Sequence, residues 1–358
     1  MNVLTLVPSE QGYSPGQRSS IELWEQALAA AGIRLHYAPF ETSRLRQILH
    51  QPGKTAAKAW EMLRAYEGRL RLLDELDRFD AVFVYREAAL LGPAFLEKRI
   101  ARRKPIIYQL DDPLFVPYRS PSNGLFSYLK CFSKVAEICR LSKVVIVNSP
   151  QIREYAEQYN GNLWQVPCLV DAEQYVFDSA QPESDNDKVC LGWSGSPSTV
   201  GNLRIVAPAL RALAEEAPHR VHLIGNAQFD LPGVNFTAQA WCAETEINDL
   251  RRLQIGLAPV PVNEWNKRKF YMKTAQYMAL GIVPVCTPLG ANTQVIRHGE
   301  NGFLADSTVE WVECLRLLIN DHDLRRKLSY QAARDAHDKY TLQANQEKIV
   351  AAFRAALN

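Results

Sequence analysis

Short apolar runs alternate with longer amphipathic segments along the first half of the chain. Each run is continuous rather than interrupted by polar residues, which is typical of a parallel strand buried on both faces. We expect strands at 3–7, 34–38, 81–85, 105–110, 144–148 and 163–166, and helices at 18–31, 44–76, 90–103, 124–140 and 150–159. Strands separated by helices in this way indicate a doubly wound α/β domain, whose ligands lie at the carboxyl ends of the strands.

The same alternation begins again after 177–188 (FDSAQPESDNDK), the most polar and turn-rich segment of the chain. Beyond it we expect strands at 189–193, 220–224, 255–260 and 282–287, and helices at 200–216, 244–253, 269–280, 307–319, 322–336 and 341–357. The pattern predicts an α/β protein of two Rossmann-like, doubly wound domains with an interdomain cleft. We place the first domain at 1–168, a linker at 169–187, the second domain at 188–336 and a C-terminal helix at 337–358.

Length and composition agree with this division. The chain has 358 residues, 47% of them hydrophobic and 22% charged, which is typical of a globular protein with two cores. The seven cysteines are scattered and lack metal-binding spacing, so we expect reduced core residues and no metal site. No apolar run approaches the roughly 20 residues that cross a bilayer, and MNVLTLVPS resembles a strand rather than a signal peptide. We therefore expect a cytoplasmic protein.

The net charge of +2 hides an uneven distribution. Residues 1–160 contain 22 lysines and arginines against 17 acidic residues, whereas the rest of the chain contains 19 against 22. Much of the excess lies in 44–104, which is either a solvated helical face or a surface attracted to anionic lipid or an acidic ligand. The second alternative would place the protein at the inner face of the cytoplasmic membrane. Nucleic acid is not an expected partner, because no binding motif accompanies the charge.

A glycine-containing loop follows the first strand of each domain. The first loop contains Gly12, Ser14 and Gly16 but not the G-x-G-x-x-G pattern, so it either admits a ligand or is an ordinary strand–helix connection. The second loop, GWSGSPST (192–199), offers amides and hydroxyls suited to phosphate oxygens. It lacks the lysine of a P-loop, so an ordinary loop remains the alternative.

A cluster of cations opens the expected helix at 269–280. Lys267, Arg268, Lys269 and Lys273 fall within seven residues, where the helix dipole is already positive. A bound diphosphate would offset that repulsion, and a solvated basic face is the alternative. Since Lys269 and Lys273 are four residues apart, we expect them on one face of the helix.

Charged residues also follow two strands of the first domain. Asp111 and Asp112 come after the strand at 105–110, where they can act as a base, bind a metal, accept a sugar hydroxyl or cap a turn. Arg86 and Glu87 follow the preceding strand. They either border the same cleft or form a surface ion pair.

Three motifs of the second domain resemble a known family. They are KTAQYMALGIVPV (273–285), TPLGAN (287–292) and IRHGENGFL (296–304). They resemble the retaining nucleotide-sugar glycosyltransferases of the glycosyltransferase-B fold, in the bacterial group 1 or family 4-like form. The resemblance is strong over 189–340 and weaker over 1–165. It implies that the second domain holds most of the donor and that the last helix crosses back to the first domain.

The resemblance implies a UDP- or GDP-linked donor, no cofactor, and a glycan or glycolipid acceptor of cell-surface polysaccharide synthesis. The serine loop and the two lysines would meet the diphosphate, and residues around Asn226, Trp241 and 259–262 would border the base. Expected donor-binding residues are Gly192, Ser194, Gly195, Ser196, Asn226, Trp241, Pro259, Val262, Lys269, Lys273, Thr274 and Gln276. Expected acceptor-binding residues are Gly12, Ser14, Gly16, Arg86 and Glu87, and expected catalytic residues are Lys273, Lys269, Asp111 and Asp112.

Two positions depart from the family pattern. Family members commonly carry two glutamates eight residues apart on this helix, where the present chain has Arg268 and Gln276. The amide of Gln276 can still bind ribose hydroxyls, whereas Arg268 cannot accept a hydrogen bond from the transferred sugar. We expect a metal-independent, retaining hexosyltransferase whose lysines stabilise the departing diphosphate. A nucleotide-sugar 2-epimerase of the same fold and an inactive nucleotide-sugar-binding relative remain alternatives.

Overall fold

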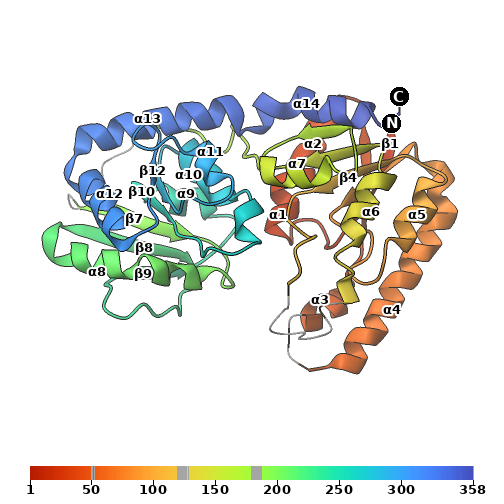
Figure 1. Cartoon of the computed structure of the whole chain (residues 1–358), viewed down its shortest axis with the longest axis horizontal. Helices are drawn as coiled ribbons and strands as arrows, with labels where there is room; N and C mark the ends of the chain where they lie inside the picture. Colours follow the sequence, from red (N-terminus) through yellow and green to blue (C-terminus); the bar gives the residue numbers. More distant parts are fainter. Residues whose placement is uncertain (50, 52, 119–126, 128, 179–187, 358) are drawn as a thin grey trace. The chain divides into compact units, whose positions relative to one another are not determined.

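The computed structural model describes residues 1–49, 51, 53–118, 127, 129–178 and 188–357. They form two compact units, and each is described by itself (Figure 1). The first unit contains Met1–Pro167, Arg268–Phe270 and Asn345–Asn358, and the second contains Cys168–Lys267 and Tyr271–Ala344. Of the expected linker, 169–178 belongs to the second unit, and 179–187 lies outside the described residues.

The first unit is built on a parallel sheet in the order β2-β1-β3-β4-β5-β6. Every residue of β3, β4 and β5 is buried, as their continuous apolar sequences predict for strands covered on both faces. The strands are β1 (Asn2–Val7), β2 (Arg34–Pro39), β3 (Ala81–Tyr85), β4 (Ile106–Leu110), β5 (Val144–Val147) and β6 (Leu163–Gln165).

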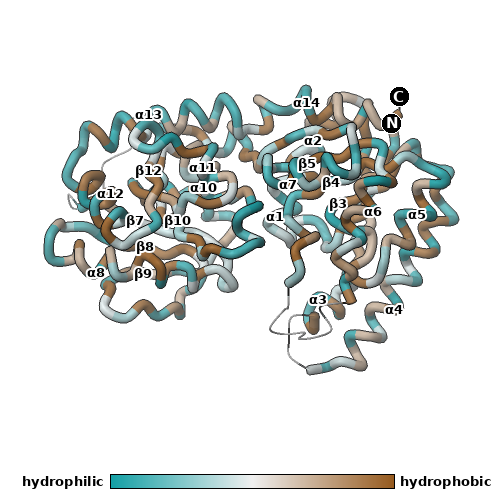
Figure 2. Tube along the Cα trace, in the orientation of Figure 1, coloured by the Kyte–Doolittle hydropathy of each residue, from teal (hydrophilic) through white to brown (hydrophobic). Residues whose placement is uncertain are grey.

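Helices surround this sheet, and the hydrophobic strands lie inside them (Figure 2). The C-terminal helix α14 packs on the sheet, because Phe353 stacks on Phe83 of β3 with ring centroids 5.4 Å apart. The helical segments are α1 (Pro15–Gln17), η1 (Arg18–Glu22), α2 (Leu23–Ala30), α3 (Ser43–Leu49), α4 (Thr55–Leu72), η2 (Leu73–Arg78), α5 (Phe95–Ala101), α6 (Lys134–Leu141), α7 (Pro150–Ala156) and α14 (Leu342–Arg354), the last beginning in the second unit.

The second unit has its own parallel sheet, in the order β12-β11-β10-β7-β8-β9. Its core includes the fully buried Trp193 and Trp311. The strands are β7 (Val189–Ser194), β8 (His219–Gly225), β9 (Thr237–Ala240), β10 (Ile255–Ala258), β11 (Val283–Cys286) and β12 (Phe303–Leu304). The helical segments are η5 (Val200–Ile205), α8 (Ala207–Glu216), α9 (Glu246–Leu250), α10 (Met272–Ala279), α11 (Asn292–Val295), α12 (Thr308–Asn320) and α13 (His322–Lys339), and η6 (Asn266–Arg268) spans the boundary of the units.

The predicted α/β fold is confirmed, while several boundaries differ. The helix expected at 44–76 divides into α3, α4 and η2, since Gly53 and Lys54 adopt the left-handed conformation between the first two. The helix expected at 124–140 is observed only as α6, and 124–126 and 128 lie outside the described residues. The helix expected at 269–280 begins at Met272, so Lys269 precedes it. Strands β9 and β12 were not predicted, because they are short and β9 (TAQA) carries no apolar run.

The cysteines and the helices bear on two other expectations. All seven cysteines are free, but Cys242 is exposed rather than part of the core. Over the described part of the chain, every helix falls short of the length and apolar character that a membrane crossing requires.

Candidate functional site

In each unit, many of the predicted site residues lie in loops at the carboxyl ends of the strands. In the first sheet the order in which strands are added reverses between β1 and its neighbour β3, and such a switch point is where open α/β sheets bind ligands. The loop with Gly12, Ser14 and Gly16 follows β1, and Arg86 follows β3. In the second sheet the switch point lies between β7 and β10, so the serine loop and 259–262 follow the two central strands.

Arg86 is the centre of a charged cluster in the first unit. Its Nε and Nη2 donate to the two carboxylate oxygens of Asp111 at 2.7 and 2.8 Å. Its Nη2 also lies 2.7 Å from Oδ2 of Asp112. The hydroxyl of Tyr85 donates to Asp111 at 2.6 Å, and Lys269 Nζ lies 3.1 Å from Asp112 Oδ1. Both aspartates are almost entirely buried, so their charges are stabilised chiefly by these partners.

The cluster changes the ionisation of its members. Burial opposes ionisation of Asp112, but the ammonium of Lys269 and then the guanidinium of Arg86 outweigh it and lower the pKa of the carboxyl. Burial, together with the nearby Asp111, raises the pKa of Tyr85 well above its usual value. Asp112 is therefore a carboxylate and Tyr85 a neutral hydroxyl at neutral pH. Such a site can accept hydrogen bonds from hydroxyl groups of an acceptor.

Gly16 and Arg86 carry the backbone features that shape this cluster. A Cβ atom on Gly16 would lie 2.9 Å from Arg86 Nη2 and 2.9 Å from the Tyr85 hydroxyl, so a side chain there would displace both groups. Arg86 itself has φ of 66°, an unfavourable conformation for a residue with a side chain. The loop of Gly12 is held differently, through the Gly12 amide, which donates to Glu22 at 2.9 Å. Ser14 precedes α1 without a side-chain capping bond.

A buried polar network fixes the segment after Arg86. Glu87 does not join the aspartates, and its carboxylate instead lies 2.6 Å from Lys134 Nζ, with both side chains buried. The guanidinium of Arg69 donates to the backbone oxygens of Val7, Ala38 and Ala88, and so ties together the ends of β1, β2 and β3. Three hydrogen bonds to carbonyl oxygens offset the free-energy cost of burying the Arg69 guanidinium. The bond to Ala88 also fixes the backbone just after Arg86, whose conformation is left-handed.

In the second unit, the glycine and serine loop after β7 is held by close backbone contacts. The Ser194 amide donates to the Tyr277 hydroxyl at 2.9 Å, and the Gly195 amide donates to Ile224 O at 3.0 Å. A Cβ atom on Gly225 would lie 1.9 Å from Gly195 O, so this contact requires glycine. Gly192 lies within β7 against Leu253, whereas Ser196 is exposed and its hydroxyl contacts that of Ser198 at 2.8 Å.

Lys273 stands beside this loop. Its Nζ lies 4.2 Å from the centre of a Trp193 ring, in cation–π geometry, and a Cβ on Gly195 would be 3.2 Å from it. The neighbouring Thr274 is buried and donates to Asn292 at 3.0 Å. The expectation that Lys269 and Lys273 share a helical face is wrong. Lys269 lies before α10 because the segment Arg268–Phe270 packs with the first unit, where Lys269 meets Asp112.

Gln276, also on α10, has two partners that sequence reasoning missed. Its amide nitrogen donates to the Tyr175 hydroxyl at 2.7 Å and to Glu246 Oε1 at 3.2 Å. Tyr175 falls within the expected linker, and Glu246 begins the short helix α9. No local pattern distinguishes either residue, but together they place a carboxylate beside the position where the family commonly has glutamate.

The remaining donor candidates lie at the carboxyl edge of the second sheet. Asn226 follows β8, and its side-chain oxygen accepts the Gln228 amide at 3.0 Å. Trp241 follows β9 and is 37% exposed. Pro259 is buried directly after β10, and Val262 is 70% exposed. Parallel strands bring these three loops to one edge of the sheet. In the described ranges of the chain, no cluster of three or more histidines, cysteines and acidic residues is arranged to hold a metal ion.

Comparison with known proteins finds a similarity within the second unit. Residues 189–321 match the family model described as glycosyl transferases group 1. A search of curated proteins found no significant match.

Solved glycosyltransferase structures share the whole fold. Sucrose-phosphate synthase from Thermosynechococcus elongatus is similar over 99% of this chain and 98% of its own, with 14% identity and a TM-score of 0.70. A glycosyltransferase from Rickettsia africae ESF-5 is similar over 100% and 98%, with 13% identity and a TM-score of 0.69. Anabaena HepE in complex with UDP-glucose is similar over 99% and 100%, with 15% identity and a TM-score of 0.69.

These matches agree with the motifs at 273–304 and with the two parallel sheets. Residues 189–321 are thus similar to the group 1 glycosyl transferases, and the whole chain has the two-sheet α/β fold of these solved glycosyltransferases.

Proposed function

We propose that the protein transfers a hexose from a UDP- or GDP-linked sugar to a glycan or glycolipid acceptor with retention of anomeric configuration. The observation that carries the proposal is Lys273, an ammonium beside the glycine and serine loop at the switch point of the second sheet. A cation, the amide of Ser196 and serine hydroxyls at one place suit a diphosphate. The UDP-glucose bound by HepE, a protein of the same fold, supports UDP as the first candidate.

The reaction needs stabilisation of the diphosphate as its bond to the sugar breaks. Lys273 and the amide of Ser196 would supply this as fixed positive charge, which costs no reorganisation during the reaction. Lys269 is our second candidate for this charge and also holds Asp112. We therefore propose that transfer requires neither a metal ion nor a cofactor.

The rest of the donor would be recognised by neighbouring loops. Gln276 and the adjacent Glu246 would bind the ribose hydroxyls, since an amide and a carboxylate together both donate and accept. Trp241 offers an exposed aromatic surface to the base, with Asn226, Pro259 and Val262 nearby along the same edge. Thr274, which is buried against Asn292, would support the position of Lys273.

The acceptor would be held in the first unit. Asp111 and Asp112 are carboxylates at the end of β4, and Arg86 orients both. Asp112 would accept a hydrogen bond from the attacking hydroxyl or from the transferred sugar. The loop of Gly12, Ser14 and Gly16 borders the cluster through Gly16, while Glu87 would act through the loop it fixes.

A thermal-unfolding panel with UDP, GDP, TDP, ADP and NAD tests the donor class. A ligand at 100 times its dissociation constant should add about 2.7 kcal/mol to the free energy of unfolding. We expect the largest shift with UDP or GDP and none with NAD. Incubation of the protein with the matching nucleotide sugar, first without acceptor and then with glycan acceptors, shows which reaction occurs.

Each product pattern identifies one candidate. A sugar transferred with its anomeric configuration retained, with the rate unchanged by EDTA, supports the proposal. A C2-epimerised sugar formed without acceptor would identify an epimerase, and binding without any conversion would identify an inactive relative. Transfer that EDTA abolishes and Mg²⁺ restores would contradict metal independence.

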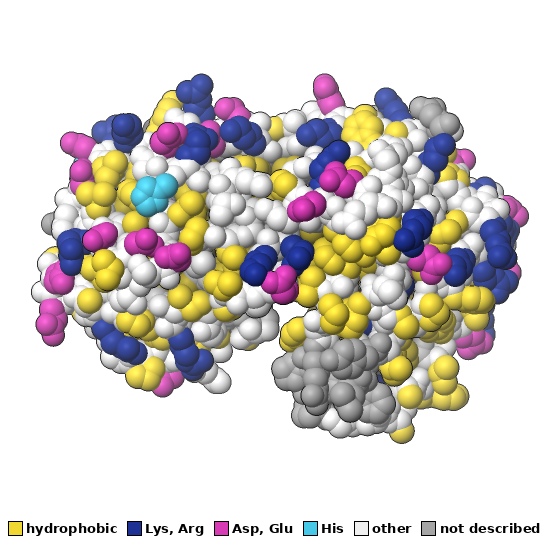
Figure 3. All heavy atoms as spheres, viewed as in Figure 1, with side chains coloured by type: hydrophobic (Ala, Val, Ile, Leu, Met, Phe, Trp, Pro, Cys, Tyr) yellow, Lys and Arg dark blue, Asp and Glu magenta, His cyan; other side chains and the backbone are white. Residues whose placement is uncertain are grey.

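We also propose that helix α4 brings the first unit to an anionic membrane. At 100° per residue, Trp60, Leu63 and Arg64 share its outward face, and Trp60 and Leu63 are 62% and 65% exposed. Arg71 continues the same face toward the end of the helix. Figure 3 shows hydrophobic side chains on the surface at the lower right, where Figure 1 places α4. Exposed aromatic and basic residues on one helical face are typical of interfacial helices.

Vesicle binding tests this surface. Replacing Trp60 and Leu63 by alanine should weaken binding to phosphatidylglycerol-containing vesicles by at least about tenfold, since each side chain contributes roughly 1.5–3 kcal/mol when fully buried. Leu317→Ala on α12, which removes another exposed leucine, is the matched control. Equal binding by the double variant and the wild type would exclude α4 as the membrane surface.

A further inference from the structure

A hollow lies along the amino ends of the strands of the second sheet. It has a volume of about 1010 Å³ and is lined by residues at the amino ends of β7, β8 and β9 and by the segment before β10. Because all these strands are parallel, this edge is opposite the one that carries Lys273 and the serine loop. Its size is at the upper end of the range for small-molecule sites.

The lining of this hollow is cationic. Lys188, Arg220, Arg251 and Arg252 contribute four positive charges, and His219 and His222 lie among them. Among the described residues that line it there is no aspartate or glutamate. Burial, with the charges of Arg252 and Arg220 as smaller contributions, lowers the pKa of His222. A concave surface of one charge sign concentrates ions of the other sign.

Neighbouring groups neutralise only part of this charge. Arg252 Nη2 lies 3.7 Å from Asp249 Oδ1, which is outside the lining, and Arg251 donates to the backbone oxygen of Val176 at 3.3 Å. The buried Nε of Arg220 has no hydrogen-bond partner within the described structure. Lys188 is exposed at the start of the unit's first strand. Arg220 and Lys188 are therefore the cations best placed to gain from an anionic ligand.

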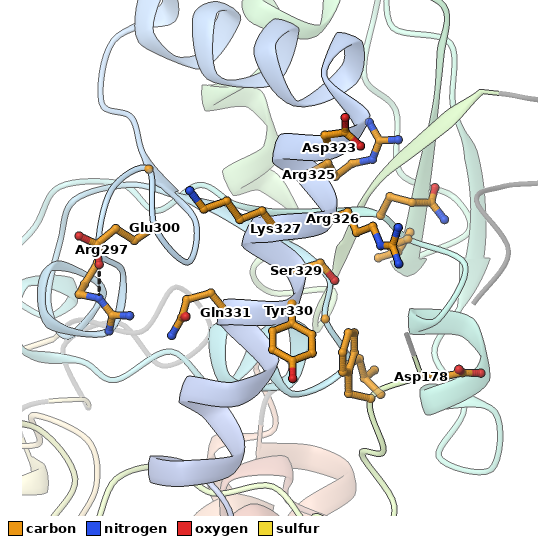
Figure 4. Close-up of a pocket in the computed structure, with 16 residues that line it drawn as sticks. Asp178, Arg297, Glu300, Asp323, Arg325, Arg326, Lys327, Ser329, Tyr330 and Gln331 are labelled. Atoms are coloured by element: carbon orange, nitrogen blue, oxygen red, sulfur yellow. Dashed lines mark hydrogen bonds and ion pairs between the residues drawn. The ribbon is translucent and has the colours of Figure 1, made fainter. Parts of the chain in front are cut away.

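An adjacent hollow in the same unit provides the contrast (Figure 4). It has a similar volume, about 1000 Å³, and also contains arginines, but Asp178, Glu300 and Asp323 line it as well. Arg297 in that hollow is already paired with Glu300 at 2.7 Å. Mixed charges that pair with one another leave little net attraction for an anion, so size alone does not mark a binding site.

Part of the lining of the cationic hollow is apolar. It includes Leu210, Val221, Val234 and Phe236, and the polar groups of the lining include the side chains of Asn235 and Asn248. We propose that this hollow binds a soluble anion with two or more phosphate groups, of nucleotide size or smaller, at a site separate from the sugar donor. The cations would bind the phosphate oxygens, and the apolar side chains of the lining would exclude water and strengthen those contacts. This inference does not depend on the proposed transfer reaction.

Calorimetric titration of the full chain with tripolyphosphate at low salt tests the proposal. We expect saturable binding by the wild type, which persists when UDP is saturating. The double variant Lys188→Ala/Arg220→Ala should bind at least about tenfold more weakly, because a charged hydrogen bond contributes about 1.5–3 kcal/mol. Arg326→Ala is the matched control, since Arg326 is an exposed cation of the mixed-charge hollow.

Four results would contradict binding of a soluble polyphosphate in this hollow. Absence of tripolyphosphate binding, an equal loss in Arg326→Ala, or complete displacement by UDP would each overturn the proposal. Binding of the wild type to anionic vesicles but not to tripolyphosphate, with the vesicle binding lost in the double variant, would also overturn it in favour of a membrane contact. Lys188→Ala alone changes an exposed side chain, so it keeps the test valid if the double variant does not fold.

Discussion

Lys273→Ala should lower kcat by about a hundredfold to a thousandfold, the usual cost of removing one preorganised electrostatic stabiliser of a transition state. The ammonium lies 4.2 Å from a ring of the buried Trp193 and next to Gly195, where we place the diphosphate. Alanine removes the charge without changing the loop's backbone. Because negative charge grows on the diphosphate as its bond to the sugar breaks, the loss should fall mainly on kcat and less on the affinity for the donor.

Lys267→Ala is the matched control for this variant. It removes a cation from the same cluster of the sequence, but its Nζ pairs with Glu264 at 2.7 Å on the surface. Its kinetics should resemble those of the wild type. Thermal unfolding of both variants checks that they fold, since the cation–π contact of Lys273 contributes about 0.5–2 kcal/mol. Wild-type kinetics in Lys273→Ala would remove the central claim of the proposed mechanism.

Much of the fold was predictable because the strands carry their own signal. β3 (AVFVY) and β5 (VVIV) are buried on both faces, so every position had to be apolar, and such runs are easily recognised. Edge strands such as β9 face fewer partners and lose that signal. The break between α3 and α4 depends on left-handed backbone at Gly53 and Lys54. A lysine in a sequence does not predict this conformation.

The candidate site was predictable only in part, for a related reason. Loops that follow strands lie at one sheet edge in any doubly wound fold, so the loops of Arg86, Asp111 and Ser194 could be named from their positions. The interaction partners of the site residues could not be named from the sequence. Glu246 contacts Gln276, which is 30 positions away in the sequence, and Lys134 pairs with Glu87, which is 47 positions away. Such pairings depend on tertiary packing, which no local pattern records.

The Arg86 cluster leads to the second large effect, on stability. Arg86→Leu should lower the free energy of unfolding by about 3–5 kcal/mol, because it removes the cation that pairs with the buried Asp111 and one of the cations beside the buried Asp112. For a unit of this size, that loss corresponds to a fall in Tm of about 10 °C. Acceptor-dependent turnover should also fall, since Asp111 and Asp112 lose the group that orients them.

The deficit of Arg86→Leu should depend on pH in a defined direction. In the wild type the pKa of Asp112 is lowered, so its ionised form stabilises the fold at neutral pH, and this contribution disappears as pH falls through the folded-state pKa. Without Arg86, less positive charge opposes the effect of burial, so the pKa of Asp112 rises. The Asp112 carboxylate of the folded variant then takes up a proton at a higher pH. The difference in stability between wild type and variant should therefore narrow from pH 7 toward pH 4.

Urea unfolding at several pH values measures this difference directly. Arg78→Leu is the control, because Arg78 pairs with Glu75 at 2.6 Å on the surface and such pairs contribute at most about 1 kcal/mol. Arg86→Lys, which keeps the charge but not the paired hydrogen bonds, should lie between the wild type and Arg86→Leu and provides a folded variant if leucine is not tolerated. A difference in stability that stays constant from pH 7 to pH 4 would show that Arg86 acts by packing rather than by its charge on the aspartates.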